Sequence, residues 1–149
     1  MSAPIIVERW VPAPPNVVYR YFTSAEWWAR WQGTGATLDP RPGGAIHIRM
    51  AGSNEAGARG HFVELVPDRR LVFTWGWIDA PFGEVPPGST LVEVDLIVQG
   101  DGTIIRLTHR QLPAGLEPMH EEGWRVYLDR LAARVAGDDP GPDPSLSER

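Results

Sequence analysis

The chain has 149 residues, of which 42% are hydrophobic and 22% are charged, and its formal net charge is -5 at pH 7. This size and composition predict one domain with one hydrophobic core. Nucleic acid is excluded as an expected partner, because phosphate binding needs a basic surface and the chain has no cluster of arginines among aromatic residues. The absence of cysteine excludes disulfides, thiolate chemistry and cysteine-ligated zinc.

The amino-terminal residues lack a basic segment followed by an apolar run, so we expect no secretory signal. No stretch reaches the roughly 18 apolar residues that a membrane-spanning helix needs. We therefore expect a cytoplasmic protein with no membrane partner.

The first elements predicted along the chain are a strand and two short helices. Residues 5–11 alternate and are rich in β-branched side chains, which predicts a strand. The prolines that follow suit the first turn of a helix over residues 16–22. Ser24 is a candidate N-cap for a second short helix with Trp27, Trp28 and Trp31 on one side.

Further segments alternate between apolar and polar residues with a period of two, which is typical of an antiparallel sheet with one buried face. Strands are expected at residues 37–39, 45–50, 60–66, 71–77, 91–98 and 103–110. Turn residues 67–70 and 100–102 predict two hairpins. The segment 78–89 is longer than a hairpin needs, which favours a lid or a binding loop.

Residues 113–136 carry the longest amphipathic pattern, with apolar residues at spacings of three and four. One long helix after many strands predicts an α+β fold in which a curved sheet grips the helix and encloses a pocket. Gly123 interrupts this helix, and such a glycine often marks a kink or a close backbone approach. We expect the domain to span residues 1–137. Residues 138–149 are rich in proline, aspartate and serine, which predicts a disordered tail.

Aromatic residues and two histidines are the candidates for lining this pocket, because apolar concave sites are the usual ligand sites. The candidate ligand-binding residues are Trp28, Trp31, Met50, Phe62, Trp75, Trp77, Phe82, His109, Met119, His120 and Trp124. For any single tryptophan the alternative is plain core packing, since large apolar side chains are mostly buried for stability.

His109 and His120 have two interpretations. They could approach one another as polar anchors or as an acid–base pair for a ligand. Alternatively, His109 is a hydrogen-bonded interior histidine and His120 lies at the surface near the start of the helix, which we favour because the histidines lack the spacing of a catalytic or metal motif. No nucleophile motif, phosphate loop or metal-ligand spacing occurs, so we assign no catalytic residue and expect no metal and no cofactor.

Ordered motifs run through nearly the whole chain outside the tail. They are VPAPPNVVYRYFT (residues 11–23), Trp31, RPGGAIHIRM (41–50), VPDRRLVFTWGW (66–77), DGTIIRLTHRQLP (101–113) and EEGWRVYLDRLAARV (121–135). Together they resemble the heat-shock-protein-90 ATPase activator homologue family in its bacterial single-domain form, within the START/SRPBCC helix-grip superfamily. The resemblance implies a curved antiparallel sheet of about seven strands wrapped around a long carboxy-terminal helix, with two short helices after the first strand. After Trp31 the family pattern has a second aromatic and a glycine-proline-like step, but here Gln32, Gly33 and Thr34 follow, so we expect a different pocket mouth.

The resemblance and the aromatic rows lead us to expect a protein that binds an apolar or aromatic small molecule without catalysing a reaction. Two alternatives stay open: a polyketide cyclase/aromatase-like or hydrolase-like enzyme, and a chaperone-interacting or other protein-interaction module. A homodimer partner is also open. In two-domain members of the family a separate amino-terminal domain makes much of the chaperone contact, and we expect that domain to be absent here.

Overall fold

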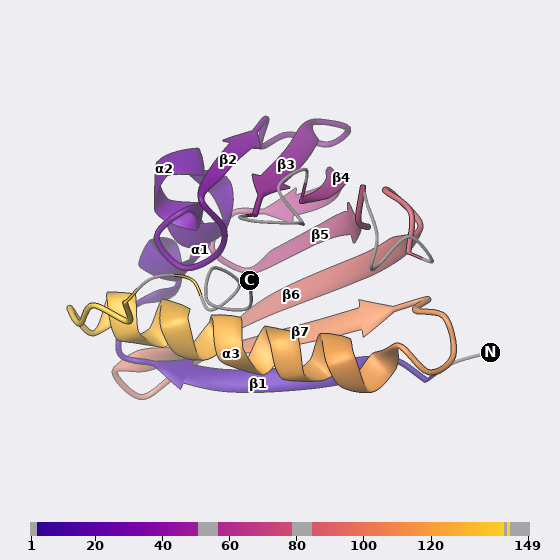
Figure 1. The fold of residues 1–149 in the computed structure, drawn as a ribbon. Helices are drawn as coiled ribbons and strands as arrows, with labels where there is room; N and C mark the ends of the chain where they lie inside the picture. Colours follow the sequence, from indigo (N-terminus) through magenta and orange to yellow (C-terminus); the bar gives the residue numbers. More distant parts are fainter. Residues whose placement is uncertain (1–2, 51–56, 79–84, 142, 144–149) are drawn as a thin grey trace.

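The computed structural model describes residues 3–50, 57–78, 85–141 and 143. A seven-stranded antiparallel sheet in the order β1-β7-β6-β5-β4-β3-β2 curves around one long helix (Figure 1). The elements are β1 (Ile5–Val11), α1 (Pro15–Thr23), α2 (Ala25–Trp28), β2 (Gly35–Leu38), β3 (Ala45–Arg49), β4 (Ala58–Val66), β5 (Arg70–Trp75), β6 (Thr90–Gln99), β7 (Gly102–Arg110) and α3 (Glu117–Val135). The expected α+β helix-grip class is confirmed.

The strands pair so that their apolar residues form rows on the inner face of the sheet. One row runs from Val7 through Leu107 and Val94 to Leu71, and all four side chains are buried. A one-residue slip in register would turn these side chains towards solvent, so the apolar pattern specifies the pairing. The same pairing places His109 on the inner face.

Strand β5 ends at Trp75, two residues earlier than the sequence pattern predicts. Gly76 follows, and a Cβ atom there would overlap the carbonyl oxygen of Pro86. Trp77 leaves the ladder with β6, forms an isolated bridge with Ala58, and donates its backbone N–H to Val85 O at 2.6 Å. The close approach of the segment around Pro86 therefore ends the regular strand.

Helices α1 and α2 cover one end of the sheet. Proline at the start of α1 has no N–H to leave unsatisfied, which suits the first turn. The Ser24 hydroxyl accepts a hydrogen bond from Trp27 N at 3.3 Å and caps α2 as the sequence predicts.

Helix α3 approaches the sheet most closely along β1, and large side chains fill the space between it and the central strands. A Cβ atom on Gly123 would meet no atom within 4 Å, so of the two alternatives for this glycine, a kink or a close backbone approach, the close approach is wrong. No helix in the described ranges is both long and apolar enough to cross a membrane. Of residues 138–149, the structure describes 138–141 and 143, and the division at residue 137 stays a prediction.

Candidate functional site

Most of the candidate residues lie on the inner face of the sheet or on the helices that cover it. Trp28, Trp31, Met50, Phe62, Trp75, His109, His120 and Trp124 are buried, with exposed fractions of 6% or less. Trp77 is partly buried, and Met119 is 42% exposed near the start of α3. Phe82 lies outside the described residues.

The buried rings pack against one another in a continuous layer. Trp28 stacks on Trp31 with their centroids 5.4 Å apart, and Phe73 joins this pair to Trp75 by edge contacts of 5.7 and 6.0 Å. Trp75 in turn contacts Trp124 of α3 at 5.2 Å. Such ring pairs add stability beyond the area they bury. The candidate residues from α2, β5 and α3 are therefore brought together, and their rings pack directly against one another.

Indole N–H groups of Trp28 and Trp31 in this layer donate to acceptors of the chain itself. Trp28 Nε1 donates to Gln32 Oε1 at 2.9 Å, and Trp31 Nε1 donates to Tyr21 O at 3.1 Å. Gln32 is only 2% exposed, and sequence reasoning did not select it as a site residue. The sequence feature that could have identified Gln32 as a partner of Trp28 is its position about one helical turn later. These bonds satisfy polar atoms that would otherwise be costly to bury.

A chain of hydrogen bonds links α3 to the sheet through His109. Trp124 Nε1 donates to His109 Nδ1 at 3.0 Å, so the neutral ring carries its proton on Nε2. That nitrogen lies 2.7 Å from Thr90 Oγ1, and the Thr90 hydroxyl donates to Trp75 O at 2.7 Å. Each polar atom in this series of hydrogen bonds is therefore fixed as a donor or an acceptor by the atom to which it bonds. Thr90 was missed by sequence reasoning because only the strand register brings it to His109.

His120 lies beside His109, with ring centroids 5.5 Å apart. Its Nδ1 is 2.9 Å from Leu116 O and its Nε2 accepts from Trp77 Nε1 at 3.1 Å. The two histidines therefore do approach one another, which is the interpretation that the sequence did not favour. The favoured interpretation is right that His109 is a hydrogen-bonded interior histidine, but it is wrong to place His120 at the surface, since that residue is only 6% exposed.

Both histidines are held in the neutral form near pH 7. Burial lowers the pKa of His109 to about 3, and the neighbouring His120 adds to this effect. Burial also lowers the pKa of His120, although its hydrogen bond to Leu116 O acts in the opposite direction. An acid–base role would require a ring nitrogen to give up an internal bond. The geometry favours a polar link in the core over catalysis.

Among the described residues, the His, Asp and Glu side chains form no group of three that could hold a metal ion.

The outer face of the sheet carries a row of apolar side chains that we call the outer apolar row: Trp10, Ile104 and Ile97. They are register neighbours across β1, β7 and β6. Trp10 is 44% exposed, yet its indole N–H donates to Gln99 O at 3.1 Å and its ring lies against Gly102. Trp10 is thus both exposed and held in place.

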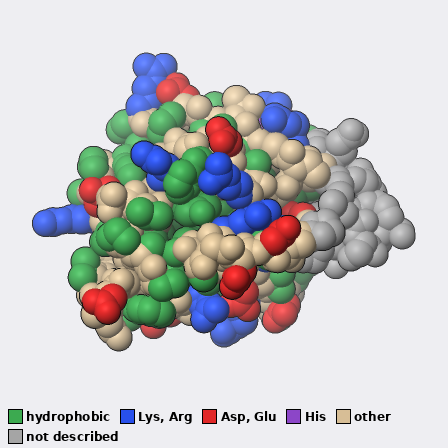
Figure 2. All heavy atoms as spheres, turned by 90° about the vertical axis from the view of Figure 1, so that its left-hand side faces the viewer, with side chains coloured by type: hydrophobic (Ala, Val, Ile, Leu, Met, Phe, Trp, Pro, Cys, Tyr) green, Lys and Arg blue, Asp and Glu red, His purple; other side chains and the backbone are tan. Residues whose placement is uncertain are grey.

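The end of the molecule that carries α1 and α2, together with the turn between β6 and β7, has a hydrophobic surface. Figure 2 shows hydrophobic side chains gathered across the middle of this end, with arginines and a few acidic side chains among them. Trp27 of α2 is partly buried there and lies under two guanidinium groups, those of Arg20 at 4.8 Å and Arg30 at 4.7 Å. Apolar surface mixed with arginine is typical of protein-binding surfaces.

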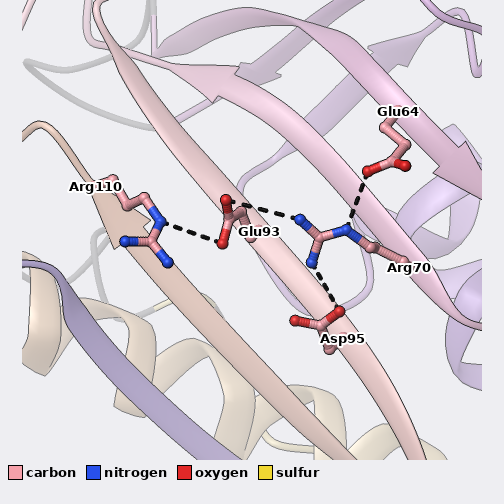
Figure 3. A network of polar contacts seen from close by, with 5 residues as sticks. All are labelled: Glu64, Arg70, Glu93, Asp95 and Arg110. Atoms are coloured by element: carbon pink, nitrogen blue, oxygen red, sulfur yellow. Dashed lines mark hydrogen bonds and ion pairs between the residues drawn. The ribbon is translucent and has the colours of Figure 1, made fainter.

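Next to the outer apolar row, the sheet carries an ion-pair network centred on Arg70 (Figure 3). The guanidinium contacts Asp95 at 2.8 Å, Glu64 at 3.0 Å and Glu93 at 3.7 Å. Glu93 also pairs with Arg110 at 3.2 Å. The hydrogen bond to Asp95 is the main cause that raises the pKa of Arg70. Because the charges alternate across the strands, the network keeps this part of the outer face polar and paired.

Comparison with known proteins decides the family. The model of the family described as "Activator of Hsp90 ATPase homolog 1-like protein" matches residues 12–136. The chain belongs to this family. The resemblance drawn from its motifs is therefore confirmed.

The chain matches only part of each curated relative. It is 26% identical over 113 residues to the human activator of 90 kDa heat shock protein ATPase homolog 1, an alignment covering 76% of this chain and 31% of the relative. The chain thus spans about a third of the curated relatives that it matches.

Solved structures of similar proteins share the fold. An AHSA1-like protein from Rhizobium etli is 46% identical, with 97% of this chain and 89% of that chain covered and a TM-score of 0.70. CalU16 from Micromonospora echinospora is 26% identical, with 89% and 76% covered and a TM-score of 0.71. This chain therefore shares its fold with both of these solved proteins.

Proposed function

We propose that the protein acts by binding another protein, a 90 kDa heat shock ATPase, and that the contact includes the outer apolar row. Membership of the activator family and the likeness to the human activator support the identity of the partner. The chain matches only a third of that relative, so the proposal concerns binding by this domain.

The observation that carries the proposal is the state of Trp10. A tryptophan that is 44% exposed normally loses side-chain freedom when a partner covers it, but the bond to Gln99 O and the packing on Gly102 already restrict this ring. Tryptophan is also enriched among the residues that dominate binding energy at protein interfaces. A fixed, exposed tryptophan in an apolar row suits a protein partner.

The packing of the interior supports the same choice over the small-molecule hypothesis. Trp75 and Trp124 are in ring contact, and His109 uses both ring nitrogens within the chain. A ligand placed between α3 and β5 would have to displace these groups. The described interior is therefore better suited to stabilising the fold than to holding a guest.

The test is the ATPase rate of a purified 90 kDa heat shock protein with and without this protein. We expect the wild-type protein to raise the rate, and Trp10→Arg to weaken binding at least about tenfold, as for a central interface tryptophan. Met119→Arg is the matched control, because Met119 is 42% exposed and lies in the first turn of α3. In Figure 1 the start of α3 and the end of β1, where Trp10 lies, are at opposite sides of the molecule. The proposal fails if the wild-type protein does not bind, or if the two variants behave alike while both remain folded.

A second candidate function is the binding of an apolar ligand at the other end of the layer. The observation in its favour is that the ring layer reaches the partly buried Trp77, which contacts Trp75, and that Met119, next in the chain to the Trp77 partner His120, is exposed. Titration of hydrophobic aromatic compounds should then give a saturable change in tryptophan fluorescence that Met119→Arg weakens and Trp10→Arg leaves intact. No response across a diverse set of compounds would remove this candidate.

A further inference from the structure

Two arginines of α3 connect the loop after α2 to the segment after α3. Arg130 Nε donates to Trp31 O at 3.1 Å, and its Nη2 donates to Gly141 O at 3.1 Å. Arg134 Nε donates to Arg30 O at 2.9 Å. Arg130 thus holds a main-chain carbonyl of residues 138–143 against the body of the domain.

The carboxylate of Asp143 lies at the same junction and is only 5% exposed. Its Oδ2 accepts from Gly33 N at 2.6 Å, and its Oδ1 accepts from the Tyr127 hydroxyl at 2.8 Å. Each carboxylate oxygen therefore has a donor from a different part of the fold. A buried carboxylate needs such bonds, and bonds to a charged acceptor are stronger than neutral ones.

The donors are positioned by contacts that do not involve Asp143. Gly33 has φ of 78°, and a Cβ atom there would come within 2.5 Å of Arg49 O, so the position requires glycine. The next residue, Thr34, donates its backbone N–H to Arg49 O at 2.8 Å and fixes the loop on β3. Tyr127 is placed by α3. Gly33, two residues after Trp31, thus supplies a backbone donor whose position is fixed by β3.

The acceptor, in contrast, belongs to a segment joined to α3 through glycines in the left-handed region. Gly137 has φ of 89° and Gly141 has φ of 81°. Donors fixed on the domain and an acceptor on the peptide segment that follows α3 correspond to the two halves of a peptide-binding site.

We propose that Gly33, Tyr127 and Arg130 form a binding site for an acidic peptide segment of a partner protein, which the chain's own Asp143 occupies in cis. Arg130 takes a main-chain carbonyl of the peptide, while Gly33 N–H and the Tyr127 hydroxyl take an aspartate carboxylate two residues later. The site lies away from the outer apolar row and does not depend on a chaperone being the partner.

The probe is a synthetic peptide with the sequence of residues 138–149, DDPGPDPSLSER, added to the full-length Asp143→Ala chain. The readout is the backbone amide resonance of Gly33. We expect the substitution to shift this resonance and the peptide to restore it in a saturable way. The wild-type chain should bind the peptide at least about tenfold more weakly, because the tethered segment competes at high effective concentration.

Two controls separate carboxylate recognition from general association. A peptide carrying Asp143→Ala should bind the freed site at least about tenfold more weakly, the size expected for losing hydrogen bonds to a charged group. Adding Tyr127→Phe to the Asp143→Ala chain should weaken binding of the unchanged peptide, whereas Tyr19→Phe on α1 should leave it unaltered. Equal binding of the two peptides would overturn the proposal. A Gly33 resonance that is the same in the wild-type and Asp143→Ala chains would also overturn it.

Discussion

His109 shows how one buried residue can set the pH dependence of folding. In the folded chain burial lowers its pKa from 6.5 to about 3, with a further contribution from His120. At pH values well above 6.5 the ring is neutral in both the folded and the unfolded chain, so it gives no pH dependence there. As the pH falls from about 6.5 towards 3, the unfolded chain takes up a proton that the folded chain does not, and the free energy of unfolding falls.

We predict that this residue contributes a slope approaching about 1.4 kcal/mol per pH unit below pH 6. Urea unfolding of the wild type and of His109→Gln at pH 7, 6, 5 and 4 measures it, and the variant should show the shallower loss of stability. His61→Gln is the control, because His61 is exposed on β4. Parallel curves for the wild type and His109→Gln would contradict the assignment of a neutral, buried His109.

Gly102 allows Trp10 to lie flat on the sheet edge. A Cβ atom at this position would overlap Val11 O and lie 2.6 Å from the Trp10 ring. We predict that Gly102→Ala lowers stability by about 1–3 kcal/mol, as overpacking does, and shifts the fluorescence of Trp10. Unchanged thermal stability together with an unchanged tryptophan spectrum would contradict the described packing.

At the scale of elements, α3 carries a glycine that its packing does not require. A Cβ atom on Gly123 would meet nothing within 4 Å, and the residue lies in the interior of the helix. Alanine is favoured over glycine there by up to about 1 kcal/mol. We predict that Gly123→Ala raises the melting temperature and leaves the Trp124 environment unchanged, as near-ultraviolet circular dichroism would report. A loss of stability would indicate a tight contact at this position.

The strands β4, β5 and β6 are joined on the outer face by Arg70. Replacing it with Gln removes the contacts to Glu64, Glu93 and Asp95 and leaves these carboxylates close together. We predict a loss of about 1 kcal/mol at low salt that becomes smaller in 1 M NaCl, since salt screens part-exposed charges. Arg41→Gln, which removes a single exposed pair with Asp39, should change the unfolding free energy little. Equal effects of the two substitutions would argue against a network.

Period-two alternation and hairpin residues were enough to predict most elements, because burial of one sheet face leaves a direct mark on the sequence. The rows through Val94 and Leu107 follow from that pattern. The early end of β5 does not, since it depends on Pro86 from a distant segment.

The apolar pattern predicts that most of the candidate residues are buried, as they are, but it does not predict their contacts, and their role in binding stays a prediction. Apolar spacing brings Trp75 and Trp124 to the interior, whereas the hydrogen bond between Trp124 and His109 depends on how far the sheet curves. Asp143 was not foreseen as a contact residue. The acidic, proline-rich segment that contains Asp143 has no periodicity from which its contacts with the rest of the domain could be predicted.

At the scale of the whole molecule, the sheet separates an aromatic interior from an outer face that carries the outer apolar row. The interior layer joins α2, β5 and α3 and holds its histidines neutral, which suits a stable core. The outer face presents Trp10 beside a paired charge network, which suits contact with another protein. Family membership identifies the class of chaperone with which such contact is proposed.

The most direct test of this account follows the indole N–H resonances of the protein while a 90 kDa heat shock ATPase is added. Trp10 donates to Gln99 O at the surface, whereas Trp28 and Trp124 donate to buried acceptors. We predict selective broadening of the Trp10 resonance at substoichiometric chaperone, with the Trp28 and Trp124 resonances much less affected. Binding that leaves Trp10 unchanged, or an absence of any change at saturating chaperone, would contradict the account.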